Sequence, residues 1–226
     1  MKINKKLLVT LLLSFSSISS HAYVRDYLYL GAGVGPSFNN YSFTVKDIPT
    51  GLSITSYPSN ISWIGNIFLG YGYTFTNCFY LAGELGTNFP NRTTSVTRSG
   101  VINALQYQDQ LGLQDYITLD LLPGYRGFDP SLLVYGRIGA SFSRMTISQN
   151  ASGTDQSFSA SYGTTAGGRI GIGATYSLTL NLGLSADYYF AAYPTLWVNQ
   201  TLNSGSSQYK QQPHVNYLGL SLLYSF

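Results

Sequence analysis

Hydrophobic and polar residues alternate along most of this 226-residue chain, in stretches separated by polar segments rich in Ser, Thr, Asn, Gln and Gly. Large apolar side chains at every second position are typical of β-strands with one face against an apolar environment. Each stretch can supply the about 9–11 residues with which a tilted strand crosses a bilayer. The eight stretches are Tyr27–Phe38, Ile61–Phe75, Phe79–Phe89, Asp115–Arg126, Leu132–Arg144, Tyr162–Tyr176, Thr179–Ala191 and Val215–Phe226.

The connections between these stretches alternate strictly between long and short, starting with a long one. The short connections are residues 76–78, residues 127–131 and the join near Ser177. The long connections are residues 39–60, 90–114, 145–161 and 192–214. Short turns on one side and long loops on the other are typical of outer-membrane barrels. The sequence therefore predicts an all-β fold, an eight-stranded antiparallel up-and-down transmembrane β-barrel, with a short helix as an alternative within residues 101–111.

The distribution of side chains over the two strand faces favours a membrane barrel over a soluble one. In the seventh stretch Leu182 and Leu184 lie on one face, opposite Ser185 and Asp187. A soluble barrel needs charges on its outer face, yet only 9% of the residues are charged, against about 25% in an ordinary domain. We therefore expect the apolar face to point outward to lipid and the polar face to point inward.

The first 22 residues have the composition of a secretory signal peptide. Lys2, Lys5 and Lys6 precede an apolar run, and small residues precede Ala22. We expect residues 1–22 to be removed and residues 23–226 to form one outer-membrane β-barrel domain. Three of the twelve Lys and Arg leave with the signal peptide, so nine basic residues remain against nine acidic ones. A neutral mature chain gives no reason to expect nucleic acid as a partner.

Five charged residues fall on the predicted inward face of five consecutive strands. A charge that faces lipid would cost several kcal/mol near the midplane of the membrane. That all five lie on the polar face therefore supports the assignment of this face to the inside. They form an expected interior charge network in which two guanidiniums neutralise three carboxylates. Two interpretations stay open, a structural filling of a narrow barrel and the gate of a small, low-conductance pore. The five residues are Glu84, Asp120, Arg137, Arg169 and Asp187.

The chain ends on a strand with an aromatic side chain as its last residue. A closed barrel pairs its last strand with its first, so such an end leaves no exposed edge. The alternating pattern is formed by Leu218, Leu220, Leu222, Tyr224 and Phe226. In this feature the chain resembles the small outer-membrane barrels of the OmpA, OmpX and Opa type, in which such a pattern is read by the barrel-assembly machinery during insertion.

The resemblance extends over the mature chain. LLVYGRIGASFSR (132–144) and GRIGIGATYSLTLNLGLSADYYF (168–190) are similar to strands of the OmpA membrane domain. We expect this chain to lack the periplasmic peptidoglycan-binding domain of full-length OmpA. The resemblance implies a bacterial outer-membrane location, contact with membrane lipid and lipopolysaccharide, and a role in envelope structure or host attachment. It implies no enzyme activity and no cofactor or metal. The alternative is a lipid A-modifying acyl hydrolase or transferase, for which His214 is the one histidine outside residues 1–22.

Attachment would need a recognition surface, and the predicted long loops supply aromatic residues for it. Tyr together with Ser, Gly and Asn is a common composition of binding loops, and equally of loops that are only solvated. A host-surface ligand therefore stays an open alternative to a purely structural role. The candidate recognition residues are Tyr41, Tyr57, Tyr107, Tyr193, Trp197 and Tyr209.

Overall fold

The computed structural model describes residues 24–99, 106–151, 157–202 and 205–226, and the regular structure in them is antiparallel β-sheet. No helix in these ranges is long and apolar enough to cross a membrane. The strands are β1 (Tyr27–Asp47), β2 (Ser53–Ser56), β3 (Ser59–Thr74), β4 (Phe79–Phe89), β5 (Arg92–Ser99), β6 (Gln106–Asp129), β7 (Leu132–Ala151), β8 (Ser157–Ser177), β9 (Leu182–Ala192), β10 (Leu196–Leu202) and β11 (Gly205–Ser225).

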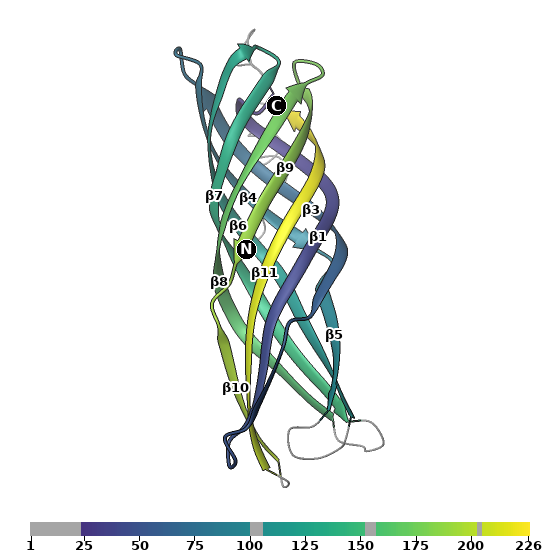
Figure 1. The fold of residues 1–226 in the computed structure, drawn as a ribbon. Helices are drawn as coiled ribbons and strands as arrows, with labels where there is room; N and C mark the ends of the chain where they lie inside the picture. The colour runs from purple at the N-terminus through teal and green to yellow at the C-terminus, as the bar shows by residue number, and fades with distance from the viewer. Residues whose placement is uncertain (1–23, 100–105, 152–156, 203–204) are drawn as a thin grey trace, which may run out of the picture.

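Eight of these strands close into a barrel. Each pairs with its neighbour along the chain in the order β1, β3, β4, β6, β7, β8, β9 and β11. The ring closes because β11 pairs with β1, from Tyr29 opposite Ser225 to Asp47 opposite Ser207. Figure 1 shows the tilted strands wound around a common axis. The predicted eight-stranded up-and-down barrel and its closure by the last strand are confirmed.

Each of the three short strands, β2, β5 and β10, is separated by a proline from the longer wall strand that it extends. Pro58 lies between β2 and β3, Pro90 between β4 and β5, and Pro194 between β9 and β10. Proline has no N–H to donate to a ladder, so a wall strand is locally broken at each of these positions. The interruption at Pro58 is small, because its carbonyl still accepts a hydrogen bond from Tyr41 N at 2.9 Å.

An apolar belt surrounds the barrel near its short turns. Outward residues such as Leu69, Leu121, Ile172 and Leu220 are exposed, whereas the alternate positions are buried. Aromatic rings border the belt at both ends, as expected for the two interfaces of a bilayer. The exposed rings at the expected positions are Phe38, Trp63, Phe75, Phe79, Phe89, Tyr125, Tyr176, Tyr224 and Phe226.

Much of what the sequence predicts as long loops is strand, so that prediction is wrong in part. Five strands contain 20–24 residues each, about twice the number that a bilayer requires. They are β1, β6, β7, β8 and β11. Residues 106–111 belong to β6 instead of a helix, and residues 101–105 lie outside the described residues. Beyond the belt the outer wall faces water, so polar residues there are compatible with pairing, and polarity does not mark a loop.

Beyond the belt the barrel divides into two four-stranded sheets. In one, β10, β11, β1 and β2 pair in that order. In the other, β5, β6, β7 and β8 do so. Among the described residues β2 pairs only with β1, and β10 only with β11. Figure 1 shows the two sheets diverging toward their tips, at the lower end of the view.

The inside is filled by side chains in three apolar clusters. The cluster at the short-turn mouth consists of Val24, Tyr29, Phe68, Tyr80, Ala82, Leu122, Leu133, Tyr135 and Leu223. The middle cluster consists of Ile64, Leu113, Met145, Tyr189, Ala191, Tyr193, Val215 and Tyr217. The third lies between the two sheets and consists of Tyr41, Phe43, Val45, Leu111, Ile147 and Tyr209. The divided end therefore has a packed interior of its own.

Candidate functional site

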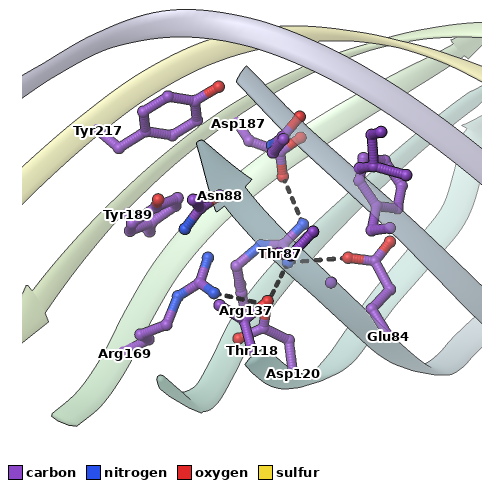
Figure 2. Close-up of a pocket in the computed structure, with 14 residues that line it drawn as sticks. Glu84, Thr87, Asn88, Thr118, Asp120, Arg137, Arg169, Asp187, Tyr189 and Tyr217 are labelled. Atoms are coloured by element: carbon purple, nitrogen blue, oxygen red, sulfur yellow. Dashed lines mark hydrogen bonds and ion pairs between the residues drawn. The ribbon is translucent and has the colours of Figure 1, made fainter. Parts of the chain in front are cut away.

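The structure brings all five predicted interior charges together, with Arg137 at their centre. Its guanidinium contacts Asp120 at 2.6 Å, Glu84 at 2.8 Å and Asp187 at 3.0 Å. Figure 2 shows the three carboxylates arranged around Arg137 from different strands of the wall. A guanidinium has five donors in a fixed plane, which suits it to several carboxylates at once. Arg137 therefore holds together three acidic side chains that would otherwise repel each other.

Arg169 lies at the edge of this network. Its Nη1 is 3.4 Å from Asp120, and its guanidinium lies 4.1 Å from the centre of the Tyr189 ring. The free space between these side chains is about 20 Å³, room for about one water molecule. The side chains therefore leave little free space at this level of the lumen.

Strand pairing places the five charged residues. Glu84 on β4 lies directly opposite Asp120 on β6, and Asp120 lies opposite Gly139 on β7. Like charges opposite each other destabilise a strand pair, so this pairing requires a nearby cation. A Cβ at Gly139 would collide with Asp120 Oδ1 and the Leu119 carbonyl. Glycine at that position leaves the space in which the Asp120 carboxylate turns toward Arg137.

Sequence reasoning missed Arg25, which supplies the third cation of the network. Its Nη1 contacts Glu84 at 2.5 Å, and its Nη2 donates to Tyr135 Oη at 3.0 Å and lies 4.0 Å from Asp187. The guanidinium also lies 4.6 Å from the centre of the Tyr135 ring. With Arg25 the network has three cations and three carboxylates.

Residues 24–26, hereafter the N-terminal plug, close the mouth of the barrel next to the short turns. Val24 is fully buried in the mouth cluster, and its carbonyl accepts a hydrogen bond from Arg126 Nη2 at 2.8 Å. The Arg25 carbonyl accepts one from Tyr80 Oη at 3.0 Å. Asp26 accepts one from Thr74 Oγ1 at 2.7 Å. Backbone and side-chain contacts together fix the plug.

A second ionic cluster lies further from the mouth, centred on Asp115. Its carboxylate pairs with Arg92 and accepts hydrogen bonds from Asn88 Nδ2 at 2.8 Å and Tyr193 Oη at 2.8 Å. Ser143 donates to the same carboxylate. A buried carboxylate with this many donors is stabilised in its ionised form. Arg92 lies in a segment that the sequence analysis assigned to a loop, whereas Asp115 is the first residue of a predicted strand.

A third ionic cluster lies on the inner face of the sheet formed by β5, β6, β7 and β8, and it joins Arg98 on β5 to Asp109 on β6. Arg98 Nε lies 2.5 Å from Asp109 Oδ2, and Gln149 Nε2 donates to Asp109 Oδ1 at 2.9 Å. Burial raises the pKa of Asp109 above its usual range, against the opposing effect of Arg98. The Arg98 guanidinium also lies 4.9 Å from the centre of the Tyr107 ring. The divided end therefore has an ionic contact within one sheet in addition to the apolar contacts between the two sheets.

The candidate recognition residues occupy different environments, and four of the six are not in loops. The four in strands are Tyr41, Tyr107, Trp197 and Tyr209, and the buried ones are Tyr41, Tyr193 and Tyr209. They point inward because these segments continue the barrel wall, so these three are excluded from an exposed surface. Tyr57 is 78% exposed and Trp197 is 55% exposed, so these two remain available for contact.

The histidine considered for acyl transfer packs against an aromatic ring of the neighbouring strand. His214 stacks on Phe190 with ring centres 6.0 Å apart, and its buried Nδ1 has no hydrogen-bond partner. The base of a serine triad is oriented through that nitrogen. In the described ranges no group of three or more His, Cys, Asp or Glu could hold a metal.

The predicted insertion pattern occupies the outer face of β11 and the residue after it. Leu218, Leu220, Leu222, Tyr224 and Phe226 are all exposed in the apolar belt. Phe226 N donates to the Leu28 carbonyl at 3.1 Å, so the last residue is still held by the first strand. The pattern thus lies on the strand that closes the barrel by pairing with β1.

Residues 8–226 match the family model described as "Outer membrane protein beta-barrel domain". No curated protein matches the chain. Solved structures share its fold. Outer membrane protease OmpT from Escherichia coli aligns with a TM-score of 0.54 and 9% identity, over 93% of this chain and 100% of that one.

Two further structures are similar. Outer membrane protein OprG from Pseudomonas aeruginosa aligns with a TM-score of 0.53 and 13% identity, over 92% of this chain and 100% of that one. Neisserial surface protein A aligns with a TM-score of 0.44 and 12% identity, over 88% of this chain and 97% of that one. The two alignments with TM-scores above 0.5 indicate a shared fold, and identities this low carry no function from one chain to the other.

Proposed function

The chain belongs to the family of outer-membrane protein β-barrel domains, and from this premise we propose that it is a surface protein for attachment to host cells. The barrel is located in the bacterial outer membrane, where short turns face the periplasm and long hairpins face the outside. The hairpins carry the proposed contact surface, and the filled barrel serves as their support. A purely envelope-structural role is the competing function, and neither role requires catalysis.

The observation that carries the proposal is the packed extension of two sheets beyond the belt. A barrel that only had to span the membrane would need about half of this strand length. The extra length is ordered by the Arg98–Asp109 pair and by the cluster that includes Phe43 and Leu111. Rigid scaffolds with exposed tips are favourable for binding, because little conformational entropy is lost on contact.

The tip between β1 and β2 exposes apolar side chains well outside the belt. Ile48 is 46% exposed, Leu52 is 57% exposed, and Tyr57 lies just beyond β2. The turn is fixed by Asp47, which accepts hydrogen bonds from Thr50 N at 2.8 Å and Thr50 Oγ1 at 2.5 Å. Apolar groups held in water on a rigid turn favour contact with another macromolecule.

Binding of host cells tests this proposal. A non-adherent bacterium that expresses the protein is expected to bind cultured epithelial cells, and Ile48→Ser with Leu52→Ser is expected to lower that binding at least fivefold. Substitutions of exposed surface residues usually cost little stability, so the double variant should keep its heat-modifiable folded band. Thr93→Ser, on the outer face of β5, is the matched control. Background binding by the unchanged protein, folded in the outer membrane, would leave the envelope-structural function.

The barrel is expected to conduct no steady ionic current. Three apolar clusters and three ionic clusters fill the described lumen in succession, and the space around Arg137 is about 20 Å³. Eight strands enclose a space just wide enough for side chains. Purified protein in planar bilayers should therefore give no long-lived conductance steps. Steady large steps from folded protein would instead support a porin, and steady small steps would support the low-conductance pore.

A further inference from the structure

We infer that the outer wall beyond the belt carries a binding face for the phosphorylated sugars of the lipopolysaccharide around the barrel. The face lies on the sheet formed by β10, β11, β1 and β2. It rests on the outer-membrane location alone and does not depend on host attachment. It consists of two rows of outward side chains, Trp197, Lys210, Thr44 and Thr55 in one, and Asn199, Gln208, Lys46 and Ser53 in the other.

The outer surface beyond the belt carries positive charge, whereas the acidic side chains at this level point inside the barrel. Beyond the belt, the described charged residues that point outward are Lys46, Arg144 and Lys210, all cations. The described acidic residues at this level are Asp47, Asp109 and Asp115, and all three are buried. The two lysines are diagonal neighbours, since Thr44 pairs with Lys210 and Lys46 pairs with Gln208. Such neighbours are about 7–8 Å apart, a spacing that one phosphorylated sugar can bridge.

The remaining side chains of the face suit a saccharide. Lys210 Nζ lies 5.2 Å from the centre of the Trp197 ring, so a flat aromatic surface adjoins the cation. Thr44 and Thr55 hydroxyls are 2.9 Å apart, and Gln208 donates to Asn199 at 3.0 Å. These groups supply hydrogen-bond donors and acceptors for sugar hydroxyls. The face contains no acidic side chain to repel a phosphate.

The direction and height of the face identify the partner. The face points sideways from the wall, toward the neighbouring lipid headgroups, whereas the hairpin tips point away from the cell. Lys46 lies eight positions after Phe38, the last belt ring on β1. At about 3.3 Å per residue on a tilted strand the lysines lie roughly 20 Å beyond the belt. That is the level of the phosphorylated core sugars of the outer leaflet, well beyond its acyl chains.

Fluorescence titration of the folded, full-length protein tests the inference. In a Trp63→Phe background Trp197 is the remaining tryptophan, so its emission reports directly on the face. The probes are rough lipopolysaccharide with phosphorylated core sugars, the same material after dephosphorylation, and heparin. Phosphorylated lipopolysaccharide is expected to bind about tenfold more tightly than the dephosphorylated form. Lys46→Gln with Lys210→Gln should weaken it about tenfold, and Lys46→Arg with Lys210→Arg should restore it.

Arg144→Gln is the matched control, because it removes one outward cation from β7 in the other sheet. It should leave binding within about twofold of the parent. Equal affinity of the parent and the double Gln variant would overturn the inference, and so would an equal loss caused by Arg144→Gln. Tighter, lysine-dependent binding of heparin than of lipopolysaccharide would assign the face to host sulfated glycans instead. Host-cell binding that persists in the double Gln variant would separate this face from the proposed attachment function.

Discussion

Replacement of Arg137 by Met is expected to destabilise the folded barrel by about 3–5 kcal/mol, the cost of leaving buried charge without its partner. Arg137 contacts Glu84, Asp120 and Asp187 within 3.0 Å. Met is unbranched and uncharged, so the variant replaces the apolar stem of Arg137 and removes its guanidinium. Arg25 and Arg169 would remain, against three carboxylates. The urea midpoint of the heat-modifiable folded band measures the effect.

Two variants separate the loss of charge from the loss of volume. Arg169→Met removes a cation that makes one ion pair, at 3.4 Å, and should cost about 1–2 kcal/mol, in the range of an ordinary substitution. Adding Asp120→Asn to Arg137→Met restores neutrality and should recover part of the lost stability. An Arg137→Met barrel as stable as the parent would show that the network contributes nothing to stability, since a buried ion pair is not favourable in every protein.

The alternation of residues was sufficient to predict the barrel and the facing of its side chains. Phe79–Phe89 coincides with β4, because turn residues flank it and its apolar face is unbroken. Glu84 and Asp187 could be placed inside since a charge on the lipid face is strongly unfavourable. That argument works only within the belt, where one face must be apolar.

Beyond the belt the same argument failed to predict strands. Water covers the outer wall there, so outward side chains can be polar, and the strand has no apolar outer face to recognise. The segment Tyr41–Lys46 does alternate, with Phe43 and Val45 buried and Thr44 and Lys46 outward. The same alternation occurs in β6, where the buried positions are Asp109, Leu111, Leu113 and Asp115. Period two alone, without the demand for an apolar face, would have extended both strands. The Arg98–Asp109 pair could have been found in this way.

No periodic pattern could have placed Arg25. It precedes the first strand by two residues and lies three residues after Ala22, the predicted end of the signal peptide. Its backbone has a positive φ of 76°, which turns the chain back into the mouth. A count of charges offered the only signal, because two predicted cations faced three carboxylates. An unmatched carboxylate in a buried network calls for a further cation.

The N-terminal plug is expected to open when Arg25 is replaced by Ala. The guanidinium is the part of the plug that reaches Glu84 and Tyr135, and the ring of Tyr29 lies 5.4 Å from it. Without it Glu84 loses its 2.5 Å partner, and the free energy that seats the plug falls by about 2–4 kcal/mol, as for other broken buried charge pairs. The fraction of barrels in which the N-terminal plug is displaced should therefore rise more than tenfold.

Thiol labelling detects that opening. Val24→Cys in a Cys78→Ser background leaves a single, fully buried thiol, which should react slowly with a polar maleimide in the folded, detergent-solubilised barrel. Adding Arg25→Ala should accelerate the reaction more than tenfold, while Arg25→Lys should give an intermediate rate because it keeps the charge and loses the planar fork. Fast labelling with Arg25 intact, in protein that keeps its folded band, would mean that residues 24–26 do not close the mouth. Slow labelling in all three would mean that the backbone contacts to Tyr80 and Arg126 suffice.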